Sequence, residues 1–451
     1  MMRLSILLFV IFLLSSCVNT TKPAVATTNT VTLSRAEYRD SLYGFWLGQC
    51  IANWTGLVTE MDKIGNIGEI KTGKFYTRND WGKPDQPSIW GQGVPSDLSE
   101  TIDFVTVKPD GIWGSDDDTD IEYIYQYLLK NSESVLLTPE QIRAGWMKHV
   151  YSSAEPTPFG RDPEGDYENF LWVSNQKAFD LMQAGTLPPL TGSQSLNEHY
   201  DMIDAQLTSE IFGFFAPVRV DIALKISDLP VRTVADKEAA DIARFYITMY
   251  SLASAVDKSL PMNEQVIWMA EQARKQLPDD QYPAAMYDFV KKLYLANTPW
   301  EKTRDAIYQR YQVQQLDGYT ITARNLYCNG CFAAGINFAA SLVSLFYGEG
   351  DLKETIKIGA LMGWDSDNPT ATWGGLLGFM YSKKAIEQAF GQTFSNRFNI
   401  HRTRRNFPNN GIDTFENMAE DGVAIVDKVV VQLMGGRIDA DDDSWVIPLH
   451  P

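Results

Sequence analysis

Residues 115–129 read SDDDTDIEYIYQYLL, and this stretch indicates both the fold class and the chemistry of the chain. Apolar side chains recur in it at the spacing of one helical face, at Ile121, Ile124, Tyr125, Leu128 and Leu129. This i, i+3, i+4, i+7, i+8 pattern predicts an amphipathic helix with one buried face. Three successive aspartates precede that helix, which is more negative charge than the start of a helix requires.

Helical periodicity extends over most of the remaining chain. A capping box at Ser34–Glu37 predicts a helix through Ile51, and further helices are expected at 139–150, 174–183, 201–215, 217–226, 233–256, 262–275, 281–296, 301–312, 331–347, 351–362, 368–378 and 413–434. Residues 62–113 are rich in Gly, Pro, Asp and Trp and predict a long functional loop region. One short strand fits 445–447. Because no linker divides the body, the sequence predicts an all-α protein with a single large helical domain over residues 34–451.

The first 33 residues are expected to target and tether the protein. Arg3 and the apolar run after it predict a signal peptide over residues 1–16, too short to span a membrane. Leu14–Cys17 resembles a bacterial lipoprotein processing site, with Cys17 as the lipidated residue; the alternative is an ordinary cleaved signal with an incidental cysteine. Residues 17–33 are expected to be a flexible tether. We therefore expect a lipid-anchored protein of the bacterial cell envelope, at the periplasmic or outer-membrane surface, that meets the membrane only through this lipid.

The composition excludes several classes of function. The 451 residues carry a formal net charge of -18, so the basic footprint of a nucleic-acid-binding protein is missing. Only four histidines are present, and none has metal-ligand spacing to another histidine or to a cysteine. A zinc site or a histidine-based catalytic triad is therefore hard to assemble. The negative charge favours binding of cations.

A second acidic cluster, GWDSDN at Gly363–Asn368, also stands just before a predicted helix. Helix capping explains one Asp or Asn at each helix start, but not the crowding in the two clusters. Carboxylates packed this closely repel one another unless a cation lies between them. If the fold brings the clusters together, they form an all-oxygen site suited to Mg²⁺, Mn²⁺ or Ca²⁺.

Three cysteines remain in the body of the chain: Cys50, Cys328 and Cys331. The pair at 328 and 331 forms a lone CxxC, which is a weak signal for redox chemistry or zinc binding. With no second pair to complete a Cys₄ site, packed thiols or a local disulfide are the favoured interpretations.

The two clusters resemble the motifs of the ADP-ribosylglycohydrolase family, which includes dinitrogenase-reductase-activating glycohydrolases and J1-crystallins. Asp117-Asp118-Thr119 is similar to the motif that opens a helix near the family's N-terminus, and GWDSDN is similar to its C-terminal Gly-Gly-Asp-Thr-Asp-Thr. The resemblance implies an all-helical fold that binds two Mg²⁺ ions. The positions that match the family's ligands are Asp116, Asp117, Asp118, Asp365, Asp367 and Asn368, with Glu60 as the N-terminal acidic ligand.

The resemblance implies hydrolysis of an N- or O-glycosidic bond of ADP-ribose or a related furanosyl sugar. Bound metal would position a water and lower its pKa, while a carboxylate acts as base or stabilises an oxocarbenium-like transition state. The candidates for that carboxylate are Glu60, Asp117 and Asp118. Asp116 stands where the family often has Thr or Ser, and Asn368 stands where the family has Thr. These departures leave open an alternative, a non-catalytic glycan- or nucleotide-binding lipoprotein on the same scaffold.

Two tryptophans next to the clusters are expected to contact substrate. Trp113 precedes the first cluster and Trp364 lies within the second, and an indole face can stack on a sugar ring or a base. Core packing, which is the role of most tryptophans, is the favoured alternative for both. The segment 169–175 is another candidate lining for a pocket, although core packing is favoured there.

Overall fold

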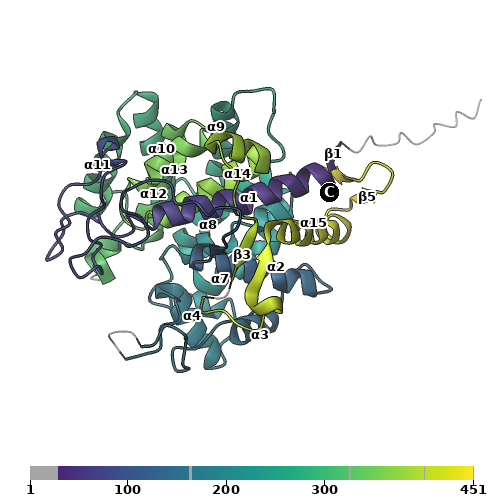
Figure 1. Ribbon diagram of the computed structural model, residues 1–451, viewed down its shortest axis with the longest axis horizontal. Coiled ribbons are helices and arrows are strands. Elements are labelled where there is room, and N and C mark those ends of the chain that lie inside the picture. Colours follow the sequence, from purple (N-terminus) through teal and green to yellow (C-terminus); the bar gives the residue numbers. More distant parts are fainter. Residues whose placement is uncertain (1–28, 162–164, 325–326, 401, 450–451) are drawn as a thin grey trace, which may run out of the picture.

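The computed structural model describes residues 29–161, 165–324, 327–400 and 402–449, and the described part is mostly helical, which confirms the predicted class (Figure 1). The α-helices are α1 (Arg35–Gly56), α2 (Asp117–Asn131), α3 (Pro139–His149), α4 (Val173–Gln183), α5 (Asp204–Ser209), α6 (Phe212–Phe215), α7 (Val220–Val234), α8 (Lys237–Leu252), α9 (Met262–Ala273), α10 (Tyr282–Leu295), α11 (Trp300–Ile307), α12 (Ala334–Gly348), α13 (Leu352–Ala360), α14 (Asp367–Phe390) and α15 (Phe415–Gln432).

Helices α1 and α14 form the closest helix pair of the fold and run side by side (Figure 1). Gly44 lies against Gly378, and Gly48 lies against both Gly374 and Gly378, so the two helices are antiparallel. A Cβ atom on Gly48 would overlap the carbonyl oxygen of Gly374 and approach the Cα of Gly378 to 2.9 Å. Glycine is therefore required at this crossing, because backbone atoms cannot move aside as a side chain can.

The change Gly48→Ala is expected to lower the free energy of unfolding by about 3 kcal/mol, since a methyl group must force the two backbones apart. A urea unfolding curve measures it. The matched control is Asp40→Ala, an exposed position of the same helix, for which we expect little change. Equal midpoints for the two variants would contradict the packing of α1 on α14.

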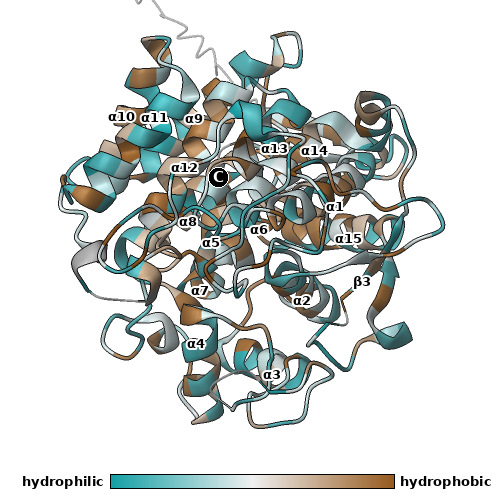
Figure 2. Cartoon of the chain, turned by 60° about the vertical axis from the view of Figure 1, so that its left-hand side comes forward, coloured by the Kyte–Doolittle hydropathy of each residue, from teal (hydrophilic) through white to brown (hydrophobic). Residues whose placement is uncertain are grey.

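Helix α12 is the central helix, as its apolar sequence predicts. It contacts α8, α9, α10, α11, α13 and α14, and Figure 2 shows it enclosed by these helices. The surrounding helices carry apolar and polar segments in alternation (Figure 2), as amphipathic helices do. One predicted helix, 201–215, is instead the two short helices α5 and α6. Between them, the Ile211 N–H donates to Glu122 Oε1 at 2.7 Å and not to a helical carbonyl.

Within the described residues, six short strands form two three-stranded sheets. One contains β1 (Thr30–Ser34), β6 (Ser444–Pro448) and β5 (Arg437–Asp439), with β1 and β6 antiparallel so that Val31 pairs with Ile447. The other contains β2 (Trp113–Gly114), β3 (Arg397–Asn399) and β4 (Ile412–Thr414). The strand predicted at 445–447 lies in β6. The prediction of a tether up to residue 33 is wrong at its end, because residues 30–33 pair with β6.

Residues between α1 and α2 form the predicted long irregular region, which contains the short 3₁₀ turn Arg78–Asp80 and ends in β2. Two backbone hydrogen bonds attach it to the second acidic cluster. The Met61 N–H donates to the Trp364 carbonyl at 2.9 Å, and the Trp364 N–H donates to the Lys63 carbonyl at 2.8 Å. The region therefore holds Glu60 beside the start of α14.

The predicted signal peptide, Cys17 and the N-terminal part of the tether lie outside the described residues. Among the helices that are described, none combines the length and the apolar character needed to cross a bilayer.

Candidate active site

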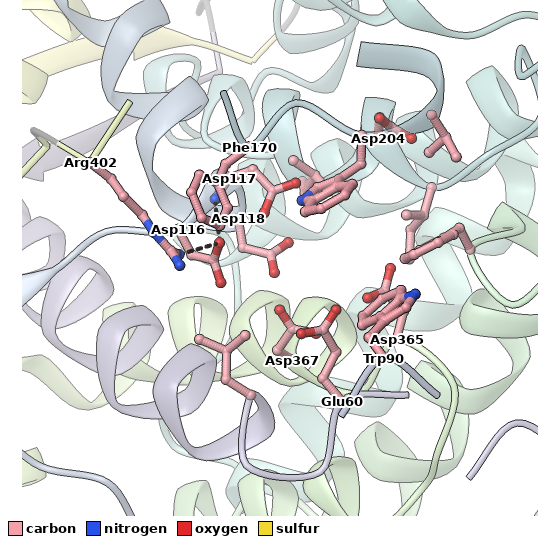
Figure 3. Close-up of a pocket in the computed structure, with 16 residues that line it drawn as sticks. Glu60, Trp90, Asp116, Asp117, Asp118, Phe170, Asp204, Asp365, Asp367 and Arg402 are labelled. Atoms are coloured by element: carbon pink, nitrogen blue, oxygen red, sulfur yellow. Dashed lines mark hydrogen bonds and ion pairs between the residues drawn. The ribbon is translucent and has the colours of Figure 1, made fainter. Parts of the chain in front are cut away.

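The two acidic clusters, about 250 residues apart in sequence, meet in one cavity of about 170 Å³ (Figure 3). The first cluster is at the N-terminus of α2 and the second at the N-terminus of α14. Their side chains face each other, with Glu60 beside Asp367 (Figure 3). The carboxylates that line the cavity are those of Glu60, Asp116, Asp117, Asp118, Asp204, Asp365 and Asp367.

Three of these carboxylates are spaced to hold a metal ion. Glu60, Asp365 and Asp367 each offer one oxygen, and the three oxygens lie within 4.8 Å of one another. Oδ1 of Asp367 is buried without a hydrogen-bond partner, which is costly unless something else satisfies it. The oxygen-only donor set and the unsatisfied atom both fit a hard divalent cation such as Mg²⁺.

The backbone around these three residues is shaped to bring them together. Gly56, the last residue of α1, packs so closely on α14 that a Cβ atom would overlap the Cα of Asp367. Met61 and Trp364, which flank Glu60 and Asp365, both adopt left-handed backbone conformations, with φ of 57° and 58°. Such conformations are unfavourable for residues with a Cβ and concentrate at functional sites.

Asp118 is held by two amide side chains. Nδ2 of Asn53 donates to its Oδ2 at 3.2 Å, and Nδ2 of Asn368 donates to its Oδ1 at 2.7 Å. Asn368 does not appear among the residues lining the cavity, although its Oδ1 is buried without a partner. The structure thus gives Asn368 a positioning contact, and its role as a metal ligand stays a prediction.

The other aspartates of the first cluster have separate structural tasks. Asp116 is the N-cap of α2: its Oδ1 accepts the Asp117 N–H at 2.9 Å and lies 3.3 Å from Nη1 of Arg402. Asp120 does not line the cavity and forms a fully buried ion pair with Nε of Arg404 at 3.1 Å. The cavity-facing residues are therefore Asp116, Asp117 and Asp118, as the family pattern implies.

The crowding of carboxylates changes their proton affinity. Burial, reinforced by the charges of neighbouring carboxylates, raises the pKa of Glu60, Asp117, Asp118 and Asp365 well above the ordinary values. For the same reasons the pKa of Asp367 rises to about 6. Without a cation these carboxylates therefore retain protons. A bound cation would favour the charged carboxylates and displace those protons.

The prediction that Trp113 and Trp364 contact substrate is wrong. Both side chains are 0% exposed. The Trp113 indole donates to the Ser395 carbonyl at 2.9 Å, and the Trp364 indole donates to Oε1 of Gln312 at 2.7 Å. Their indole N–H groups are satisfied inside the core, so neither ring is available to a ligand.

The aromatic residues that do line the cavity are Trp90, Phe170, Trp172 and Phe332. Trp90 comes from the long loop, and Phe170 and Trp172 come from the segment 169–175, for which core packing was the favoured interpretation. That preference is wrong for these two residues. Asp204 is a further lining residue that no motif predicted, because it stands apart from both acidic clusters in the sequence.

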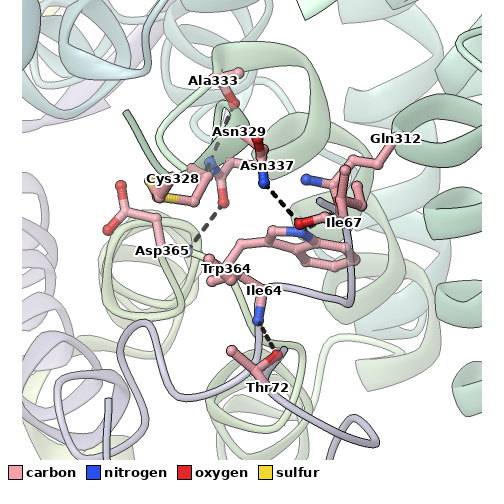
Figure 4. Close-up of a disulfide and its surroundings, with 11 residues drawn as sticks. Ile64, Ile67, Thr72, Gln312, Cys328, Asn329, Ala333, Asn337, Trp364 and Asp365 are labelled. Atoms are coloured by element: carbon pink, nitrogen blue, oxygen red, sulfur yellow. Dashed lines mark hydrogen bonds between the residues drawn. A yellow bond between two sulfur atoms is a disulfide. The ribbon is translucent and has the colours of Figure 1, made fainter. Parts of the chain in front are cut away.

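A disulfide joins Cys328 and Cys331, in agreement with one of the two favoured interpretations of the CxxC (Figure 4). Nδ2 of Asn337 donates a hydrogen bond to the Cys331 carbonyl at 2.8 Å, and the Asp365 N–H donates one to Oδ1 of Asn337 at 3.3 Å. Phe332, the next residue, lines the cavity. The disulfide loop therefore supports one wall of the site and, through Asn337, the backbone of a predicted metal ligand.

Comparison with known proteins agrees with the motif evidence. The sequence model of the ADP-ribosylglycohydrolase family matches residues 34–423. A solved structure described as an "ADP-ribosylglycohydrolase-related protein complex" is similar with 13% sequence identity and a TM-score of 0.46, covering 87% of this chain and 99% of that chain. No curated protein sequence matches the chain. With the family match extending from α1 into α15, across both acidic clusters, the chain belongs to the ADP-ribosylglycohydrolase family, a family of glycosyl hydrolases.

Proposed function

We propose that this protein is a metal-dependent glycoside hydrolase that cleaves a bond at C1 of a ribose-like, furanosyl sugar. The observation that carries the proposal is the convergence of both acidic clusters, with Glu60, around one cavity. Six predicted oxygen donors line that cavity. Helix capping does not explain this convergence, because each cap acts only on its own helix start.

A divalent cation at Glu60, Asp365 and Asp367, with a second at the first cluster, would polarise sugar hydroxyls and acidify a water. Two of the chain's own carboxylates then have separate roles. Asp118 is fixed by two amide donors, so its negative charge keeps a set position in the cavity. Glu60 faces the cavity, is partly exposed, and offers one oxygen to the metal group. We therefore propose that its other carboxylate oxygen accepts the proton that the attacking water loses.

Metal removal tests the proposal. A release assay on ADP-ribosyl and pentofuranosyl substrates is expected to show hydrolysis with Mg²⁺, loss of activity in EDTA and recovery when Mg²⁺ is restored. Unchanged turnover in EDTA would contradict metal dependence. Tight binding of these compounds with no turnover over long incubation would favour the non-catalytic alternative.

We also propose that the mature protein is attached to the bacterial envelope by a lipid on Cys17. The basis is the apolar run before this residue and the resemblance of Leu14–Cys17 to a lipoprotein processing site. Cell fractionation of Cys17→Ala checks it: a variant that stays as firmly in the membrane fraction as the wild type would contradict the anchor.

A further inference from the structure

We propose that the cavity selects uncharged, phosphate-free glycosides and discriminates against the pyrophosphate of ADP-ribose. This inference rests on the proposed function and narrows its substrate class. It follows from three features of the cavity: how its helix N-termini are capped, how few cations line it, and how its aromatic wall is built.

Two of the helix N-termini at the cavity, those of α2 and α4, are already occupied by carboxylates of the protein. The third, that of α14, has no side-chain cap, but its first residue is Asp367. An uncapped helix N-terminus is a ready site for a phosphate, because its N–H groups have no partner. At α2, Asp116 accepts the Asp117 N–H at 2.9 Å. At α4, Oδ1 of Asp204 accepts the Asn175 N–H at 2.8 Å. A phosphate group arriving at either helix would meet a negative charge where it needs a donor.

The cations that a pyrophosphate needs are scarce here. Among the described residues that line the cavity, Arg402 is the one basic side chain, against seven carboxylates. Its Nη1 lies 3.3 Å from Asp116 Oδ1, and its guanidinium lies over the Phe170 ring at 3.9 Å from the ring centre. This cation is therefore already paired and stacked. Even with two divalent ions bound, the lining has five positive charges against seven negative ones and stays net negative.

The aromatic wall offers flat apolar faces beside the carboxylates. Trp90 lies almost parallel to Trp172, with ring centres 6.3 Å apart and 8° between the planes, and almost parallel to Phe332, at 5.7 Å and 16°. The two tryptophans are 38% and 41% exposed. Exposed, aligned rings at the rim of a polar cavity are suited to the apolar face of a sugar ring.

Asp204 supplies a hydrogen-bond acceptor for such a ligand. The residue is 2% exposed, and its Oδ2 lacks a partner while the side chain lines the cavity. An unsatisfied buried oxygen favours a ligand that brings a hydroxyl donor and opposes one that brings another anion. A neutral sugar meets this requirement, whereas a phosphate does not.

The first test compares ligands by calorimetry on the Mg²⁺-loaded protein, with 4-nitrophenyl α-L-arabinofuranoside, 4-nitrophenyl β-D-ribofuranoside and ADP-ribose as probes. We expect at least one furanoside to bind about tenfold or more tightly than ADP-ribose. Asp204→Asn keeps the shape but removes the charge, and it should tighten ADP-ribose binding about tenfold without improving furanoside binding. Equal or tighter binding of ADP-ribose by the wild type, or an unchanged ADP-ribose affinity in Asp204→Asn, would overturn the proposal.

The second test examines the aromatic wall. Trp90→Ala should weaken furanoside binding about tenfold and raise KM with little change in kcat, because a stacking contact is lost. The matched control is Trp81→Ala, in the same loop but packed on Phe104 outside the cavity, which should leave binding unchanged. Equal affinities for Trp90→Ala and wild type would contradict a ring-stacking role.

These results separate this inference from the proposed function. If no substrate is hydrolysed but furanosides bind in a Trp90-dependent manner, the proposed hydrolase activity fails and the specificity inference stands. If EDTA-sensitive hydrolysis is faster for ADP-ribosyl substrates than for furanosides, the activity stands and the specificity inference fails.

Discussion

Asp367→Asn is expected to lower kcat/KM by about a thousandfold, since a divalent cation contributes several kcal/mol to the transition state. Asp367 is the first residue of α14, is 3% exposed and contributes an oxygen to the group formed with Glu60 and Asp365. Asparagine has the same shape and keeps one oxygen, so packing at the helix start is preserved while the charge that attracts the metal is lost.

The control for this variant addresses the alternative explanation of the acidic clusters, helix capping. Asp351 caps α13, accepting the Glu354 N–H at 2.8 Å, and is exposed. Asp351→Asn should leave both activity and the response to Mg²⁺ unchanged. Thermal melting gives a second measurement: Mg²⁺ at a hundred times its Kd should stabilise the wild type by about 2.7 kcal/mol and Asp367→Asn far less. Wild-type activity in Asp367→Asn would exclude the metal site at this position.

The sequence predicted those parts of the site that carry a dense local signal. The stripe from Ile121 to Leu129 predicts a helix, and the three aspartates at its start exceed what a cap needs. These residues made a cation site a candidate beside helix capping, and the family resemblance favoured the cation site. That the second cluster meets the first depends on long-range contacts between the starts of α2 and α14, such as the hydrogen bond that Nδ2 of Asn368 donates to Oδ1 of Asp118. Those contacts could be expected only through the family resemblance.

The substrate-facing residues could not be predicted, for identifiable reasons. Trp113 lies next to the aspartates in sequence, but it is in β2 and pairs with Phe398 of β3, and its side chain is buried in the core. Trp90 lies in a loop without periodicity, and periodicity is the signal that tells which face of an element is buried. Asp204 lines the cavity because α5 packs against α2 and α4, and no local pattern reports such contacts.

Metal-free protein is expected to lose stability as the pH rises from about 4 to about 6. The pKa of Asp367 is raised from 3.8 to about 6 by burial and by the charge of Asp116. Between these two values the folded state keeps a proton that the unfolded state releases, so the free energy of unfolding falls with increasing pH. This pKa shift corresponds to a loss of about 3 kcal/mol in the free energy of unfolding from Asp367 alone. Asp204, whose pKa is also raised to about 6, acts in the same direction.

Other buried groups also titrate, so the measurement must isolate the cavity. Burial raises the pKa of Glu210, in the core beside Glu122, to about 8, which extends the loss of stability toward pH 8. Burial lowers the pKa of His149 and of His199, which has the opposite effect. None of these four residues lines the cavity, so we expect Mg²⁺ to leave their contributions unchanged.

The decisive quantity is therefore the difference between unfolding free energies with Mg²⁺ and with EDTA, measured by urea titration from pH 4 to pH 8. We expect it to be near zero at pH 4, where the carboxylates hold protons, and to grow through pH 6 as the metal takes their place. In EDTA, Asp367→Asn should be more stable than the wild type at pH 7, because one repelling charge is gone, although the same variant is expected to lose nearly all activity. A wild type that gains stability in EDTA between pH 4 and pH 6 would contradict the raised pKa of Asp367. A Mg²⁺ effect independent of pH would show that these carboxylates do not share a cation.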